Sequence, residues 1–371
     1  NADYKYFMEL PTQLMPMNAL NPQAPEGQFR DLQFGVPHNI NANVQLAMPL
    51  YNPQVYGVIE NTKIANKLTL LQFQKSEEQV LYDITMLYYN AQILKHQLDF
   101  LESNMLNTQK LLKNMELLKK QLLAKGTDVS KVKLQTEQLN TQRENVHNKY
   151  ISILNALKLN IGIPLERNIT VVSEIEQRAL TKNNVENILD LKIIQTQNKL
   201  LNSELSTLNK SRFLPSLNLI ASYGTTGFGY DKTPNDFLKF YPIGFAGLQL
   251  TYPLFNGTVT QRKINQKKLE ISNNELQAQL IGDKNKMETE NALRQRTIAQ
   301  QTVINTENQI TLAQSIYEQT ILQQKQGTAT LTDVLLADNT LREAQQNYLS
   351  AVIDYLKADL ELKKLAGTIK N

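Results

Sequence analysis

The stretch VQLAMPLYN, residues 44–52, returns in the second half of the chain as LQLTYPLFN, residues 248–256. Each copy ends a run of alternating apolar and polar residues, which is typical of a half-buried strand, and carries a proline near its end. Each copy is followed by about seventy residues with the seven-residue period of a long coiled-coil helix. The sequence therefore predicts a duplicated unit of strand, strand, long helix and return helix.

The balance of charged residues argues against nucleic acid as a partner. The 371 residues contain 39 Lys and Arg and 35 Asp and Glu, which gives a net charge of +4 without a basic block. Cysteine is absent, so disulfides, thiolate metal sites and cysteine nucleophiles are excluded. No apolar run reaches the roughly eighteen residues of a membrane-spanning helix. If the protein meets a membrane, we expect it to do so through strands.

The clearest strand pattern lies in residues 39–50. Apolar side chains occupy every second position, and amide side chains fill the positions between them from Asn39 to Gln45. An apolar face opposite an uncharged amide face fits a strand between lipid and a watery lumen, and it fits a soluble sandwich equally well. Residues 3–10 also alternate and predict a strand. Residues 11–38 are rich in Pro, Asn and Gly and predict a long loop that has room for short local structure.

A second strand pair is predicted after the middle of the chain. Residues 212–224, RFLPSLNLIASYG, and residues 243–254 both alternate, and the second run repeats the pattern of residues 39–50. The glycine-rich residues 224–236 between them predict a loop. No helix pattern opens from these glycines, which argues against a phosphate-binding loop.

The seven-residue period begins after Pro53. Residues 54–125 contain no internal proline and predict one helix of about 105 Å at 1.5 Å per residue. We expect Gly126 to end this helix and Ser130 to cap a return helix that reaches residue 160. The seam of this first hairpin is predicted at Val80, Leu87, Leu94, Leu101, Met115, Leu122, Val132, Leu139, Val146 and Ile153.

A second helical hairpin is predicted at the end of the chain. Residues 183–210 form a shorter helix before the second strand pair, and residues 258–326 form a long, more polar helix after it. Gly327 is expected to end the long helix. The return helix, residues 329–366, places alanine at every seventh position, which lets neighbouring helices approach closely. These alanines are Ala337, Ala344, Ala351 and Ala358.

The residues that could carry out catalysis are scattered. His38, His96 and His147 lie far apart in the sequence, and none has metal-ligand spacing. No G-x-S-x-G, P-loop or dinucleotide fingerprint occurs. The sequence therefore predicts neither an enzyme nor a cofactor or metal site.

Three stretches carry a resemblance to a known family: FLPSLNL at residues 213–219, YPLFNG at 252–257 and QGTATLTDVLLA at 326–337. With the order of strands and helices, they make nearly the whole chain similar to the TolC-like outer membrane efflux proteins. The resemblance implies a mixed α+β membrane protein, a homotrimer whose chains each give four strands to one 12-stranded β-barrel. A long antiparallel coiled-coil α-helical barrel continues it. An open sheet edge in lipid would leave unpaired N–H and C=O groups, which is a physical reason for several chains to share one closed sheet.

The resemblance also implies a function and a location. Such a protein is a passive exit duct in the outer membrane of a Gram-negative bacterium, with its helices in the periplasm. It works with a periplasmic adaptor protein and an inner-membrane transporter, as part of a tripartite pump that exports drugs or small molecules or of a type I protein secretion system. The expected domains are the strand pairs at residues 1–52 and 212–256, the helical hairpins at 53–160 and 257–367, the connector at 161–182, the short helix at 183–211 and a tail at 368–371.

Site residues follow from the resemblance at the hairpin tips, where the family docks its adaptor and closes its channel. The tip residues are Gly126, Thr127, Val129, Gly327, Thr328 and Leu331, and Asp333 is the gate candidate. Lys125, Lys131 and Lys133 are candidates for an ion pair with Asp333 from a neighbouring hairpin. Val132 and Lys133 depart from the Asp-Val pair usual in the family. On the strands, the residues expected to face lipid are Leu46, Met48, Leu248, Leu250 and Tyr252.

One alternative stays open at this point. A soluble coiled-coil structural or adaptor protein, whose strands form a small sandwich and enclose no pore, would show the same periods.

A separate expectation concerns length: the helices at 131–160 and 183–210 together match one long helix, whereas the return helix at 329–366 has no such partner. We therefore expect the gene to encode a further helix of roughly thirty residues before Asn1.

Overall fold

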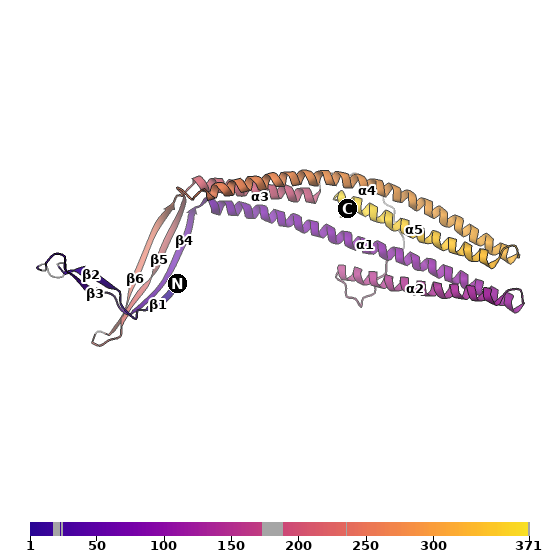
Figure 1. The fold of residues 1–371 in the computed structure, drawn as a ribbon, viewed down its shortest axis with the longest axis horizontal. Coiled ribbons are helices and arrows are strands. Elements are labelled where there is room, and N and C mark those ends of the chain that lie inside the picture. The colour runs from indigo at the N-terminus through magenta and orange to yellow at the C-terminus, as the bar shows by residue number, and fades with distance from the viewer. Residues whose placement is uncertain (18–22, 24, 173–187, 235, 370–371) are drawn as a thin grey trace. The chain divides into compact units, whose positions relative to one another are not determined.

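The computed structural model describes residues 1–17, 23, 25–172, 188–234 and 236–369. Strands and helices follow one another in the predicted duplicated order, and the repeated stretch leads from a strand towards a long helix in both halves (Figure 1). The elements are β1 (Ala2–Tyr6), β2 (Thr12–Pro16), β3 (Phe29–Gln33), β4 (His38–Tyr51), α1 (Pro53–Lys120), α2 (Gly126–Asn160), α3 (Leu189–Phe213), β5 (Ser216–Tyr230), β6 (Phe237–Thr251), α4 (Val259–Lys325) and α5 (Leu331–Leu365).

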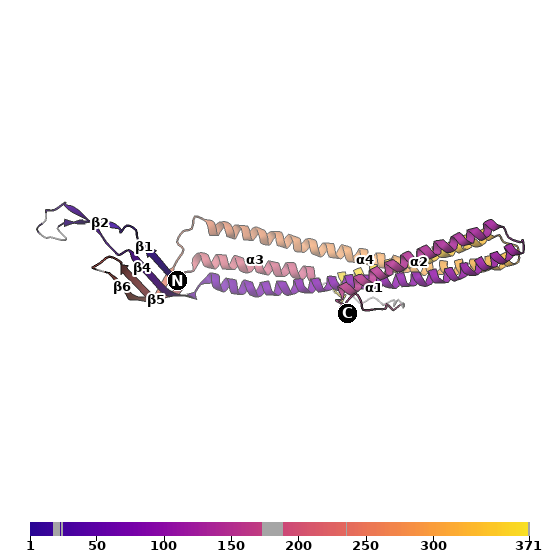
Figure 2. The ribbon, with the colours of Figure 1, turned by 90° about the horizontal axis from the view of Figure 1, so that it is seen from below.

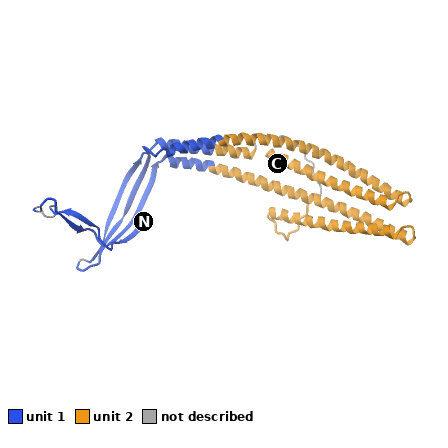
Figure 3. Cartoon of the chain, viewed as in Figure 1, with its two compact units in different colours: residues 1–64, 199–272 blue, residues 65–198, 273–371 orange. Residues whose placement is uncertain are grey.

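The chain divides into two compact units (Figure 3). The first unit contains residues 1–64 and 199–272, which include the strands and the adjoining ends of α1, α3 and α4. The second unit contains residues 65–198 and 273–371, which include most of α1 and α4 and all of α2 and α5.

The main sheet of the first unit has four antiparallel strands in the order β1-β4-β5-β6. The other two strands, β2 and β3, pair only with each other. They lie in residues 11–38, which were predicted as a long loop with short local structure, and these two five-residue strands are local structure of that kind. The predicted strand at residues 3–10 is shorter than expected, since β1 ends at Tyr6.

The predicted loop at residues 224–236 begins inside a strand, because β5 continues to Tyr230 and pairs with β6. Glycine weakens a strand unless a neighbour covers the backbone. Here the Phe240 ring covers its cross-strand partner Gly227, so that a Cβ on Gly227 would lie 2.6 Å from the ring. In the same way, the ring of Tyr223 lies over Gly244. These contacts between strands make the glycine-rich segment part of the sheet.

The long helices form two antiparallel hairpins, α1 with α2 and α4 with α5, which lie for the most part in the second unit (Figures 1 and 2). The longest helix, α1, has 68 residues. The prediction that Gly126 ends it and Ser130 caps the next helix is wrong. The helix ends at Lys120, Gly126 is the first residue of α2, and Ser130 lies inside α2. The remaining helix, α3, begins at Leu189, and the start predicted for it at residue 183 lies outside the described residues.

The predicted seams are confirmed in the helical core. Val132, Leu139 and Val146 of α2 are buried, as are the four regularly spaced alanines of α5. In α1 the seam holds at Leu101 and Met115, and Leu87 and Leu94 are partly buried. The prediction is wrong at Val80, which is 44% exposed, and at Leu122, which lies beyond the helix. The largest core cluster joins all four helices next to the two hairpin tips: Leu111, Met115, Val132, Ala313, Tyr317, Leu331, Val334, Ala337, Leu341 and Ala344.

Candidate functional site

One face of the four-stranded sheet is apolar across the strands. Residues directly opposite each other in a sheet lie on the same face, and the register pairs Met48 with Leu219 and Leu219 with Leu248. Four of the residues predicted to face lipid, Leu46, Met48, Leu248 and Leu250, therefore share one face, and their exposed fractions are between 50% and 68%. The fifth, Tyr252, lies after the last residue of β6, so its assignment to the strand is wrong.

The opposite face is less uniform than the sequence suggested. It carries the predicted amides Asn43 and Gln45 on β4. On β6, however, the same face carries Tyr241, Ile243 and Phe245, all largely exposed. Tyr241 lies before the strand predicted at residues 243–254, whereas Ile243 and Phe245 lie within it. The apolar side chains at the alternate positions 241, 243 and 245 were the available signal. This face is thus polar on β4 from Asn43 to Gln45, whereas on β6 it is apolar at residues 241, 243 and 245.

Within the described residues, β1 and β6 form the two edges of this sheet. Strand β1 pairs with residues 38–42 of β4, and Asn1 exchanges hydrogen bonds with Asn43. From Val44 onward, β4 is paired on one side alone among the described residues. Open edges present unpaired N–H and C=O groups that can pair with another chain. The sheet therefore combines an exposed apolar face with backbone groups ready to extend it.

The first hairpin tip ends α1 in an unusual way. The amide of Leu123 donates to the carbonyl of Leu118 over 2.9 Å, and the amide of Leu122 donates to Lys119 over 3.0 Å. This is a Schellman motif, which favours glycine at the position with positive φ. Leu122 occupies that position with φ of 61° and is 94% exposed. The usual sequence signal for the end of a helix is therefore missing, which is why we placed it at Gly126.

The other predicted residues of the first tip lie at the start of α2. Lys125 is the N-cap residue, and its side chain makes no capping hydrogen bond. Val129 packs against the core cluster that joins the four helices. The Lys131 Nζ lies 3.9 Å from the Asp128 carboxylate in a partly exposed ion pair. Thr127 and Lys133 are exposed on the same turns of helix.

The second hairpin tip has conventional signals. Gly327 follows α4 with φ of 78° and ends it in a Schellman motif. Thr330 and Asp333 form a capping box at the start of α5: the Asp333 carboxylate accepts the Thr330 backbone N–H at 2.8 Å, and the Thr330 hydroxyl accepts the Asp333 N–H at 3.2 Å. The hydrogen bonds from the side chain and backbone of Thr330 lower the pKa of Asp333. Leu331 points into the core cluster, whereas Thr328 remains exposed.

The gate candidate is therefore held by its own helix start. Among the described residues, the hydrogen bonds and ion pairs of Asp333 reach Thr330, and none joins it to Lys125, Lys131 or Lys133. An ion pair with a lysine of a neighbouring subunit stays a prediction. The core cluster under both tips does bring the two hairpins together, because Met115, Val132 and Leu331 all belong to it.

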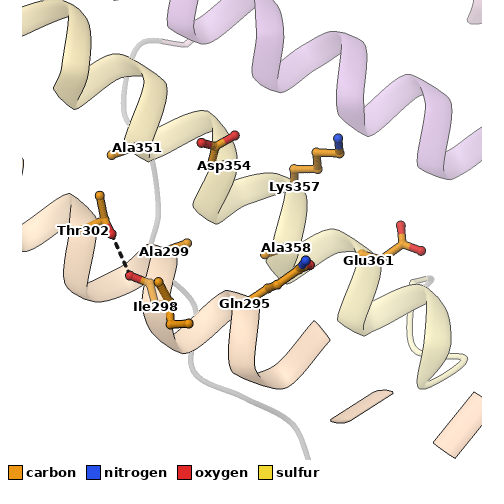
Figure 4. Close-up of a pocket in the computed structure, with 9 residues that line it drawn as sticks. All are labelled: Gln295, Ile298, Ala299, Thr302, Ala351, Asp354, Lys357, Ala358 and Glu361. Atoms are coloured by element: carbon orange, nitrogen blue, oxygen red, sulfur yellow. Dashed lines mark hydrogen bonds between the residues drawn. The ribbon is translucent and has the colours of Figure 1, made fainter. Parts of the chain in front are cut away.

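A groove with a volume of about 660 Å³ lies between α4 and α5 (Figure 4). Its lining mixes the alanines Ala299, Ala351 and Ala358 with polar side chains. The Thr302 hydroxyl donates to the carbonyl of Ile298 over 2.9 Å, a bond within its own helix.

Across the part of the chain that the structure describes, no three His, Asp or Glu side chains gather as a metal site would require. In the same residues, no helix has the length and apolar composition needed to cross a membrane.

Comparisons with known proteins agree with this architecture. Residues 201–368 match the family model of the outer membrane efflux proteins. No curated protein sequence matches the chain. Among solved structures, VceC of Vibrio cholerae is similar over 99% of this chain and 87% of its own, with a TM-score of 0.70 and 15% identity.

Two further solved structures are outer membrane channels. CmeC of Campylobacter jejuni is similar over 99% of this chain and 77% of its own, with a TM-score of 0.72 and 14% identity. The open state of MtrE of Neisseria gonorrhoeae is similar over 99% and 79%, with a TM-score of 0.73 and 13% identity. The resemblance predicted from the sequence is confirmed: the chain has the fold of the outer membrane efflux channels, and its residues 201–368 match their family model.

Proposed function

We propose that the protein is the outer membrane exit duct of a tripartite efflux pump. The observation that carries the proposal is the sheet of β1, β4, β5 and β6, which has an exposed apolar face and two open edges. In lipid, an apolar face is favourable, but an open edge costs several kcal/mol for each unpaired backbone group. Closing the edges against further copies of the chain removes this cost.

Three copies give a closed barrel of suitable size. Each chain supplies the four strands of its main sheet, so a homotrimer has 12 strands, which is enough to enclose a lumen. The long helices of the three chains then continue the duct as an antiparallel coiled-coil barrel in the periplasm. Leu46, Met48, Leu248 and Leu250 face lipid in this arrangement.

The hairpin tips are the proposed contact with the periplasmic adaptor, which links the duct to an inner-membrane transporter. Gly126 and Thr127 are the exposed residues of the first docking tip, and Gly327 and Thr328 are those of the second. Val129 and Leu331 support the two tips from the core cluster beneath them. Asp333 is the proposed gate residue, repeated around the threefold axis where carboxylates raise the local concentration of cations. Transport through such a duct is passive, so no residue is assigned to catalysis.

The alternative, a soluble coiled-coil adaptor without a pore, requires a second layer to cover the apolar sheet face. Within the described residues the leucines of that face are at least half exposed, and the other pair, β2 with β3, forms its own small sheet. The fold shared with outer membrane channels also argues against this alternative.

Membrane fractionation and gel mobility test the proposal. The full gene is expressed in a Gram-negative host, and the outer membrane fraction is extracted with detergent. We expect the protein in that fraction as a trimer that dissociates to monomer on heating. Crosslinking in living cells should also recover the trimer with a periplasmic adaptor. Recovery as a monomer in buffer without detergent would refute the duct.

A further inference from the structure

A polar seam joins α5 to both helices of the first hairpin. The amide of Asn104 on α1 donates to the side-chain carbonyl of Gln345 on α5 over 2.8 Å. The amide of Gln135 on α2 donates to the carboxylate of Asp338 on α5. These four side chains are all buried, and Asp338 is only 3% exposed. Buried polar side chains at heptad spacing select one register of a coiled coil at a cost in stability.

The Asp338 carboxylate is incompletely compensated. Arg342, one turn further along α5, places its Nε 3.0 Å from the Asp338 carboxylate, but this N–H has no partner in hydrogen-bonding geometry. The Arg342 guanidinium also donates to Asn339, away from Asp338. On the remaining sides, α4 presents Tyr317, α2 presents the uncharged Gln135, and the α1 side chains in the adjoining core cluster are apolar.

Burial determines how this site responds to pH. A carboxylate removed from water is costly, so burial raises the pKa of Asp338 above its ordinary value of 3.8, although Arg342 and Gln135 act in the opposite direction. The same burial, together with the nearby Asp338 charge, raises the pKa of Tyr317 to about 12, so the Tyr317 hydroxyl stays neutral at physiological pH. Asp338 is therefore the acid whose ionisation changes the charge of the seam.

We propose that Asp338 is an acid-strengthened clasp between the two hairpins: the neutral carboxyl keeps α2 packed on α5, and its ionisation loosens that contact. A neutral carboxyl still accepts the hydrogen bond from Gln135 without bringing a charge into the core. The ionised form keeps the hydrogen bond and adds a buried charge that Arg342 does not fully compensate. The clasp depends only on contacts within one chain and does not require the proposed duct.

The sign of the effect follows from proton linkage. The pKa of Asp338 is higher in the packed state than in the opened state, where the carboxyl is in water. Between these two pKa values the packed state binds more protons, so packing weakens as the pH rises from the lower value to the higher one. One proton gives at most about a tenfold change in the opening equilibrium per pH unit. Above the raised pKa, the equilibrium no longer changes with pH.

Amide hydrogen exchange of the full chain in detergent, measured from about pH 4 to about pH 8, tests the clasp. The exchange rates are corrected for the dependence of intrinsic amide exchange on pH. In the wild type we expect protection in residues 132–139 and 334–345 to fall as pH rises, by up to about tenfold per pH unit. Asp338→Asn, which keeps the shape without the charge, should remove this dependence. Asp354→Asn changes an exposed carboxylate of the same helix and should retain it.

Two results would overturn the clasp: protection in the wild type that does not change with pH, or an unchanged slope in Asp338→Asn. The wild-type measurement alone decides the proposal if the variant does not fold. Gln135→Ala provides a further check, because loss of its hydrogen bond removes an influence that lowers the pKa of Asp338. The loss of protection in residues 334–345 should then move to higher pH, and a shift to lower pH would contradict the clasp.

Discussion

Replacing Val44 with Arg tests which face of the sheet meets lipid. Val44 is the seventh of the 14 residues of β4 and is 78% exposed on the apolar face. At a rise of about 3.3 Å per residue the strand is about 46 Å long, which corresponds to about 35 Å of height at a tilt of about 40°. Val44 therefore lies near the midplane of the proposed barrel, where Arg costs about 2–4 kcal/mol.

That cost corresponds to a roughly 30- to 700-fold change in the folding equilibrium for each chain. Gln45→Arg is the matched control, because Gln45 is the next residue on the same strand and points to the opposite face. Both variants are folded into liposomes and titrated with urea, with the heat-sensitive trimer as the measure of folded protein. We expect a large loss for Val44→Arg and little change for Gln45→Arg. Equal losses, or a larger loss for Gln45→Arg, would refute the assignment of faces.

Three further predictions concern the tips and the sheet. Asp333→Ala should raise the resting conductance in planar bilayers and weaken block by multivalent cations from the periplasmic side; unchanged recordings would leave this carboxylate as a helix cap only. Leu122→Gly should stabilise the first tip against urea by about 1 kcal/mol, because glycine adopts positive φ without strain, and a destabilised variant would contradict the Schellman geometry. Gly224→Ala should abolish trimer formation, because the new Cβ would lie 2.2 Å from the backbone oxygen of Ala42 on β4. Gly247→Ala is the control and should form trimer, because no atom lies within 4 Å of its Cβ position. Equal trimer yields for the two variants would contradict the strand register.

Much of the fold could be predicted because periodicity is local. Alternation in residues 39–50 and seven-residue spacing from Leu101 to Met115 indicate which side chains share a face, whatever they later contact. The errors occur where a distant side chain or an unusual conformation overrides the local signal. Residues 224–230 were predicted as a loop because the sequence does not reveal that Phe240 covers Gly227.

The sequence by itself determined the duplication, the apolar strand face, the two helical hairpins and the family resemblance. The tertiary structure alone decided which strands pair in which register, and that Gln135 meets Asp338 across 203 residues of chain. The physical reason is the range of the interactions involved. Helix and strand periods follow from backbone geometry within a few residues, whereas pairing, burial and the resulting shift in the pKa of Asp338 depend on which distant groups exclude water around them.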